Sequence, residues 1–143
     1  MPNIRYDIQH NIPLVTASAP RGTSSDNTPI TLPSATTGFD LQNFEAVNVL
    51  LVSGTLADAD ATFSVELRES DATNGTYAAI DDANLIALES TAGFTFAEDN
   101  AVKQIGVVPR RRFLRVVITP ANNTGASEFS TIVQGVRNIV GTV

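Results

Sequence analysis

The feature of this sequence that most constrains its fold is the alternation within residues 62–69. Apolar and polar side chains alternate there, in the order Phe63, Ser64, Val65, Glu66, Leu67, Arg68. A period of two residues is that of a β-strand with one buried and one solvated face. The surrounding stretch, residues 39–80, consists of such strand patterns, a turn and a polar loop, with almost no catalytic chemistry. We therefore expect a packing and binding module rather than an enzyme.

Other short apolar runs, separated by Gly, Asn and Asp, extend this pattern along the chain. The predicted strands are Ala46–Ser53, Thr62–Glu69, Lys103–Val108, Phe113–Thr119 and Phe129–Gly135. Only Asn48 interrupts the apolar run of residues 47–52, which predicts a central strand buried on both faces. Residues 81–88 are the one plausible short helix. The fold class expected is all-β, an antiparallel β-sandwich or jelly-roll-like domain with at most one short helix.

The first quarter of the chain has a different texture. Residues 13–38 hold four prolines among Ser, Thr, Asn and Gly, a composition that disfavours both helix and central strand. We expect an extended N-terminal arm over residues 1–36 and a β-sandwich domain over residues 37–143. Apolar residues at even-numbered positions of the arm predict a strand that pairs with an edge, either of its own sheet or of a neighbouring subunit. These candidate interface residues are Ile4, Tyr6, Ile8, Ile12 and Leu14.

Length and composition bound the possibilities further. The chain has 143 residues, the size of one domain, and no Cys, so it has neither a disulfide framework nor a thiolate metal site. Its start lacks the layout of a signal peptide, and no apolar run approaches the roughly 20 residues that cross a bilayer. We expect a soluble protein that is made in a cytoplasm and contacts no membrane.

The formal net charge of −6 is unevenly distributed. Residues 37–100 carry a net charge of −11 and residues 101–143 carry +5. The two segments either lie side by side in the fold and neutralise each other, or they form a charge-complementary contact between neighbouring copies of the protein.

Catalytic constellations are poorly represented. The only histidine is His10, and no Gly-x-Ser-x-Gly motif accompanies it. Asp58 and Asp60 resemble the start of a calcium loop, but Phe63 stands where that loop requires Gly. The other carboxylates of residues 58–82 lie in turns and strands without the mark of a cleft. We expect no enzyme activity, no metal and no cofactor.

Arg110, Arg111 and Arg112 form the densest charge cluster, directly after Pro109. The acidic net charge argues against direct binding of nucleic acid, since such proteins present a broad basic face. Two alternatives stay open. The arginines pair with carboxylates of neighbouring strands, or they contact a partner or a second subunit.

Several segments together resemble small structural proteins of tailed bacteriophages and prophages, which are typically encoded beside the major capsid protein. The segments are FDLQNFEAV (39–47), VSGTL (52–56), ELRESD (66–71), YAAIDDANLI (77–86) and IGVVPRRRFLRVVIT (105–119). The resemblance covers about residues 39–137 and rests on strand and turn texture. It implies a capsid decoration or cement protein on the outer surface of a phage head. Such proteins are commonly compact β domains, often trimers, that clamp adjacent copies of the major capsid protein.

Two other functions remain as alternatives. One is a head–tail connector or tail component, which is also structural but present in few copies. The other is a carbohydrate-binding or host-attachment module, since β-sandwiches often serve that purpose. The chain has no Trp, and Tyr6 and Tyr77 are the only tyrosines that could stack on a sugar. The location expected from the resemblance is the virion surface, after synthesis in a bacterial host.

Overall fold

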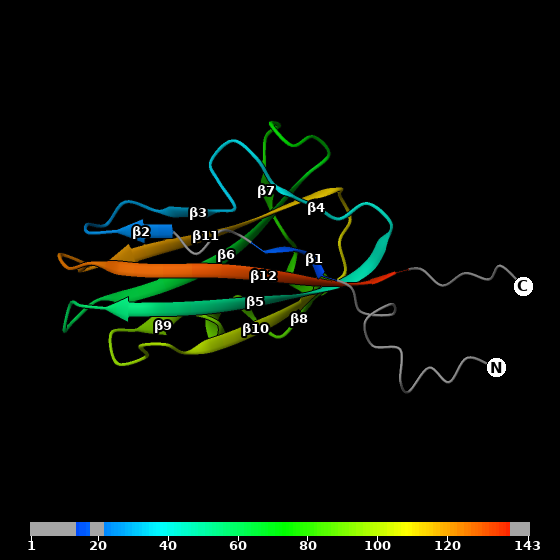
Figure 1. Ribbon diagram of the computed structural model, residues 1–143. Coiled ribbons are helices and arrows are strands. Elements are labelled where there is room, and N and C mark those ends of the chain that lie inside the picture. The colour runs from blue at the N-terminus through cyan, green and yellow to red at the C-terminus, as the bar shows by residue number, and fades with distance from the viewer. Residues whose placement is uncertain (1–13, 18–21, 138–143) are drawn as a thin grey trace, which may run out of the picture.

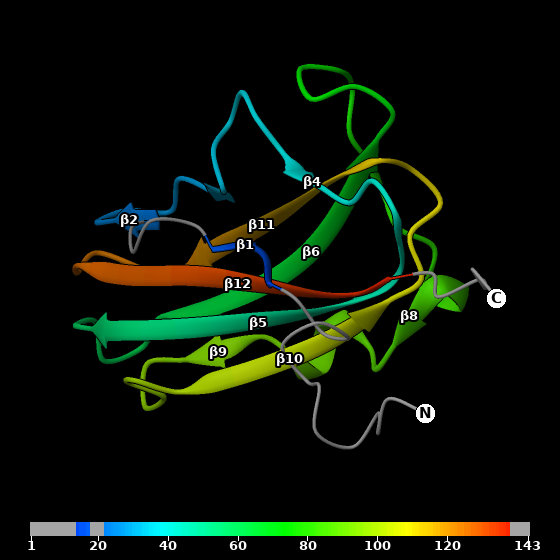
Figure 2. The ribbon, with the colours of Figure 1, turned by 45° about the vertical axis from the view of Figure 1, so that its right-hand side comes forward.

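The computed structural model describes residues 14–17 and 22–137. Two antiparallel sheets lie face to face in this part of the chain, and Figures 1 and 2 show them as two layers. The expected all-β sandwich is thereby confirmed. We call the two layers sheet A and sheet B.

Sheet A contains β1 (Leu14–Ala17), β2 (Gly22–Ser24), β5 (Phe44–Leu56), β8 (Leu85–Ile86), β10 (Val102–Val107) and β12 (Ser127–Arg137). The strand order is β1-β12-β5-β10-β8, and β2 also pairs with β12. The long strands β12, β5 and β10 run next to one another across the front layer of Figure 1.

Sheet B contains β3 (Ile30–Leu32), β4 (Phe39–Asp40), β6 (Thr62–Ser70), β7 (Ala78–Ala79), β9 (Phe94–Thr95) and β11 (Phe113–Ala121). The strand order is β3-β11-β6-β7, with β4 on β11 and β9 on β6. Successive long strands alternate between the layers, because β5 lies in sheet A, β6 in sheet B, β10 in sheet A, β11 in sheet B and β12 in sheet A. Each connection therefore crosses from one layer to the other.

The core forms between the sheets because every second side chain of each strand points inward. In β5 the odd-numbered residues Val47, Val49 and Leu51 are buried, and in β12 Phe129 and Val133 join them. Sheet B supplies even-numbered residues of β11 and odd-numbered residues of β6 to the same core.

Three phenylalanines connect the two layers at one end of the core. The ring of Phe63 on β6 meets the ring of Phe129 on β12 at 5.0 Å between centroids, edge to face. Phe94 on β9 packs against the same Phe129 ring at 5.5 Å. Edge-to-face pairs add about 0.5–1.5 kcal/mol beyond the burial of area, so this cluster ties the short strand β9 to both sheets.

All five predicted strands are present, and the structure extends four of them by one to three residues at an end. The expected short helix of residues 81–88 is present as a single turn, which ends at Asn84. Asp81 caps a 3-10 turn, η1 (Asp82–Asn84), by accepting a hydrogen bond from the Ala83 N–H, and β8 follows directly. A second 3-10 turn, η2, spans Glu89–Thr91.

No helix in the described ranges is long and apolar enough to span a membrane.

The expected division at residue 36 needs correction in the described residues. β3 pairs with β11, and its residues Ile30 and Leu32 are buried in the core. β2 pairs with β12 in the other sheet. Residues 22–36 are thus an integral part of the sandwich rather than an arm. Prolines at positions 29 and 33 confine β3 to three residues, which is too short to give a strand pattern.

The prediction for residues 47–52 is half right. β5 is the central strand of sheet A, between β12 and β10. Its second face is not buried, because Leu50 and Val52 are only partly covered. The sequence pattern indicates two covered faces, and the described chain covers one.

Gly135 on β12 is required by the packing of Phe44, whose ring lies where a Cβ at position 135 would be. We expect Gly135→Ala to lower the free energy of unfolding by about 1–3 kcal/mol, the usual effect of overpacking a core. Chemical denaturation monitored by circular dichroism measures the change. In a Phe44→Ala background the same substitution should cost distinctly less. An equal cost in both backgrounds would contradict the proposed contact.

Candidate functional site

The first candidate is the group of carboxylates in residues 58–82. Among the described residues, no group of three or more His, Cys, Asp or Glu side chains is placed to hold a metal ion. Asp58 instead accepts hydrogen bonds from the Thr124 N–H at 2.6 Å and from the Thr124 hydroxyl at 2.7 Å. These bonds hold the pKa of Asp58 well below its usual range. Asp58 thus joins the loop after β5 to the loop after β11.

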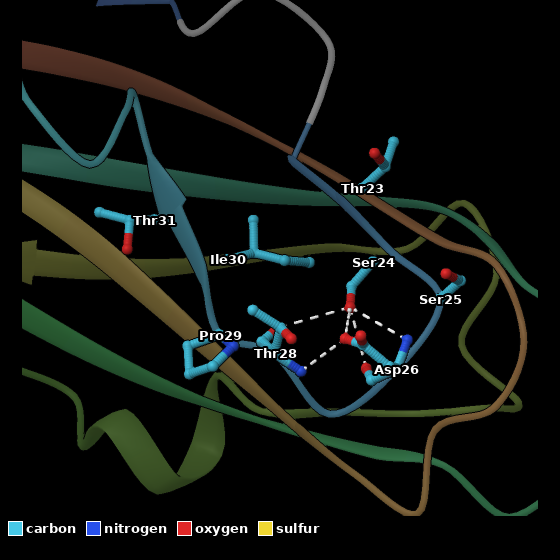
Figure 3. A pocket seen from close by; sticks show the side chains of 8 residues that line it. All are labelled: Thr23, Ser24, Ser25, Asp26, Thr28, Pro29, Ile30 and Thr31. Atoms are coloured by element: carbon cyan, nitrogen blue, oxygen red, sulfur yellow. Dashed lines mark hydrogen bonds between the residues drawn. The ribbon is translucent and has the colours of Figure 1, made fainter.

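A hollow beside the turn between β2 and β3 is lined by residues of that turn, and Figure 3 shows its hydrogen bonds. The carboxylate of Asp26 accepts from the Thr28 N–H at 2.7 Å, and the Ser24 hydroxyl donates to the Asp26 carbonyl at 2.9 Å. The bonds from Thr28 lower the pKa of Asp26. The polar groups of this hollow are used to hold the turn, so the hollow is a consequence of the local backbone.

The arginine cluster lies in the connection between β10 and β11. Arg112 binds both carboxylate oxygens of Asp40, at 2.9 and 2.8 Å, and this pair lowers the pKa of Asp40. Arg110 donates from Nε to the Asn84 side-chain oxygen at 2.9 Å. Arg111 has only a long ion pair, 3.9 Å to Asp71. The interpretation as pairs with neighbouring carboxylates is confirmed for Arg112, while Arg111 is the least engaged of the three.

A buried carboxylate fixes the backbone of this arginine loop. Glu69 on β6 is 7% exposed, and its Oε2 accepts from the N–H groups of Arg110 and Arg111 at 3.0 and 3.1 Å. Charge-assisted bonds of this kind are about twice as strong as neutral ones. The three guanidinium groups are therefore presented by a firmly held loop at one end of the sandwich.

The other predicted interface residues are placed only in part. Ile4, Tyr6, Ile8 and Ile12 lie outside the described residues. Leu14 begins β1 and pairs with Gln134 of β12, so the described end of this segment adds a strand to the chain's own sheet.

Tyr77 is engaged within the chain. The guanidinium of Arg115 lies 3.7 Å from the centroid of its ring. The same guanidinium donates to the carbonyls of Thr37 and Thr73, at 2.9 and 3.0 Å. One face of the Tyr77 ring is thus occupied, which removes part of the stacking surface that a sugar would need.

The most unusual surface is the outer face of sheet A. Register places the even-numbered residues of β5, β10 and β12 on this face, together with Ile86 of β8. From β5 residue 46 to residue 52, and at the positions paired with these residues, none of them is charged. They are Ala46, Asn48, Leu50, Val52, Ile86, Val102, Gln104, Gly106, Ser130, Ile132, Gln134 and Val136, which we call the uncharged face. Its most exposed large apolar side chains are Ile86 at 65% and Val102 at 59%.

The outer face of sheet B provides the contrast within the same molecule. There Glu66 and Arg68 form an ion pair at 2.6 Å, and Arg115 lies on the neighbouring strand β11. Such a mixed charged face is what a solvated sheet usually presents. Sheet A carries its nearest charge on that face at Glu128, beyond the end of the uncharged face, over Gly54.

The amide side chains of the uncharged face lie among its apolar ones. Asn48 donates to Gln104 across β5 and β10 at 3.2 Å. Ile86 lies directly over Gly106, and an open hollow of about 490 Å³ is lined there by Asn48, Ile86, Ala87, Gln104 and Gly106. Ala87 has φ of 87°, a left-handed conformation that is rare for a residue with a Cβ. The strained turn leaves Ile86 and its neighbour Leu88 exposed.

This face was not predicted as a site, although part of its signal is present in the sequence. The double apolar pattern of residues 47–52 predicted a cover on both sides of β5. That β10 and β12 also lack charges at the matching positions becomes apparent only when the register is known.

Glu89 of η2 is one of the residues that line a groove along the edge of β6. Its Oε1 accepts from the Leu67 N–H at 2.5 Å, which satisfies a backbone donor between β7 and β9. Burial raises the pKa of Glu89, and the nearby charges of Glu66 and Asp82 act in the same direction. The carboxylate thus protects a sheet edge from pairing with other chains.

Scanned against models of known protein families, and searched against curated proteins, the chain matches none of them.

Because the folded state raises the pKa of Glu89, it binds a proton there more tightly than the unfolded chain does. The ionised group therefore opposes folding above that pKa, and the penalty disappears as the pH falls through it. We expect Glu89→Gln, which can still accept from Leu67, to have an equal or higher melting temperature at pH 7.5. The difference should vanish toward pH 4.

Scanning calorimetry at several pH values measures this effect. Glu128→Gln, at an exposed position, removes the same charge and serves as the control. A clear loss of stability in Glu89→Gln at pH 7.5 would show that the charged hydrogen bond outweighs the burial.

Proposed function

We propose that this protein is a structural subunit of a phage virion, a capsid decoration protein that binds the major capsid protein on the outer surface of the head. The observation that carries the proposal is the uncharged face of sheet A. Of the 24 charged residues of the chain, none is among the twelve residues of this face, while the outer face of sheet B is charged in the usual way. Such a face is typical of a surface that is covered within an assembly, by a partner or by a second copy of the same subunit.

The phage head as the assembly comes from the resemblance of residues 39–137 to virion structural proteins. The proposed role is consistent with the engaged state of the carboxylates and of Tyr77. Their hydrogen bonds and ring contacts build loops. A decoration protein works by adding contact area between capsid subunits, so it needs no catalytic group and no cofactor.

Repetition gives such contacts their effect. Each decoration site contributes a modest binding energy, and subunits that span neighbouring capsid proteins add to one another by avidity. The net charge of −6 also disfavours unspecific association with nucleic acid.

The first test adds the purified protein to phage shells that lack it. We expect saturable binding at a fixed ratio to the major capsid protein, and a higher temperature of shell disruption in calorimetry. Quantitative mass spectrometry of virions should find the protein in many copies. A handful of copies per virion would refute the decoration role and favour a connector or tail component.

The N-terminal segment is tested in the same assay by deletion of residues 1–13. Deletion of residues 1–36 is unsuitable, because it removes Ile30 and Leu32 from the core. We expect the shorter deletion to weaken shell binding and to leave the unfolding transition of the sandwich in place. Unchanged shell binding would remove the segment from the proposed contact.

The arginine loop is tested by Arg111→Gln. Arg111 has a single long ion pair within the described chain, so we expect no measurable change in stability. If the loop faces the capsid protein, shell affinity should fall by about threefold to tenfold, the usual effect of a peripheral interface charge. Arg68→Gln, on the outer face of sheet B, is the matched control and should bind as the unmodified protein does. Equal affinities for both variants would exclude the loop from the contact.

A further inference from the structure

The sequence pattern of β5 indicates a cover over the outer face of sheet A, and the described residues do not provide one. Leu50 and Val52 of β5 point away from the core, as do Ile132 of β12 and Val102 of β10. Leu50, Val52 and Ile132 are partly covered and Val102 is 59% exposed. We propose that a second copy of this chain covers the uncharged face with its own uncharged face, in a two-fold, sheet-to-sheet pair.

The first argument for a second copy is electrostatic. Two molecules that each carry a net charge of −6 repel each other, and the repulsion is least where the contacting surfaces carry no charge. A foreign partner is usually selected by complementary charge, and this face offers neither sign. In a two-fold contact the same surface patch of both copies forms the interface, so a face without charges meets another face without charges.

The second argument is the kind of polar group on the face. Its longest polar side chains are Asn48, Gln104 and Gln134. An amide has both donors and an acceptor, so amides can pair with copies of themselves, whereas a carboxylate or a guanidinium cannot. Asn48 and Gln104 already share one hydrogen bond at 3.2 Å, and this bond is the only one that these two side chains make among the described residues.

The size of the uncharged face sets the strength of the pair. An interface of about 800 Å² per partner involves about 20–30 residues on each side. The uncharged face has twelve residues, and Leu88 and Val108 lie exposed at its margin. This is roughly half of a standard interface, so the association is reversible and dependent on concentration. The high local concentration on an assembled shell would favour it.

This inference concerns the face on which the proposed function rests, but it is tested without any shell. If the protein pairs in solution and fails to bind shells, the decoration role fails and the pairing stands. If it binds shells and never pairs, the decoration role stands and the pairing fails.

The experiment is sedimentation velocity of the full chain from about 10 µM to about 1 mM. We expect a reversible change from monomer to dimer. The dimer fraction should increase when NaCl is raised from about 20 mM to about 500 mM, because salt screens the repulsion between two acidic bodies. A charge-complementary contact between the acidic and basic segments would weaken under the same change, so a dimer that dissociates in salt overturns the proposal.

Two matched substitutions locate the contact. Ile132→Lys places a cation on the uncharged face, where it faces the corresponding lysine of the second copy. This variant should stay monomeric at every concentration. Val117→Lys makes a similar change on the outer face of sheet B, opposite Glu66, and should associate as the unmodified protein does. Circular dichroism confirms that both variants are folded. Loss of association in both variants, or in neither, overturns the proposal.

The absence of cysteine allows a direct second measurement. Leu50→Cys, in the middle of the uncharged face, should give cross-linked dimers with a bifunctional thiol reagent, and Thr119→Cys on sheet B should not. Three other outcomes overturn the proposal. A trimer would require unlike surfaces in contact. Association that appears only after deletion of residues 1–13 would identify that segment as the cover. A monomer whose Ile132→Lys variant loses shell binding would identify the capsid protein instead.

Discussion

The pairing register between β5 and β12 is the constraint on which the rest of this structure depends. Val49 lies opposite Val133, and side chains alternate from that point, so the register decides which residues enter the core. β5 is apolar on both of its faces and does not select the register alone. Ser53, buried and hydrogen-bonded to the loop between β9 and β10, and Gly135, which accommodates the ring of Phe44, both favour the observed alignment.

The same register distributes the charges. The basic C-terminal segment and the acidic middle segment do lie side by side, as Arg112 with Asp40 and Lys103 with Glu98 show. These pairs occur at the ends and margins of the sandwich. Surface ion pairs of this kind contribute at most about 1 kcal/mol each, so their arrangement matters more for where charge is absent than for stability. The result is that charged residues occupy the outer face of sheet B, whereas the twelve residues of the uncharged face on sheet A carry none.

Long strands were predictable from the sequence because alternation is a local property. Short ones were not, since β3 is held by a partner in β11 that is more than 80 residues away.

Pro120 in β11 also depends on a partner that is distant in the sequence. Leu67 lies opposite Val116, and its N–H donates to Glu89 and so points away from β11. Backbone amides alternate in direction along a strand, so the amide positions of residues 116, 118 and 120 point away from β6 and toward β3. β3 pairs only as far as Ile118, and Pro120 therefore continues the strand without losing a hydrogen bond.

The candidate site was harder to predict than the fold, for a physical reason. Dense charge is visible in a sequence, and it drew attention to Arg110–Arg112, although two of those side chains make close polar contacts within the chain. Missing charge is informative only on a surface, and the residues that the uncharged face pairs with β5 are 50 to 90 positions away in the sequence. Its one local trace was the doubly apolar strand β5. A strand with two apolar faces needs two covers, and where the described residues provide one, the second has to come from outside them.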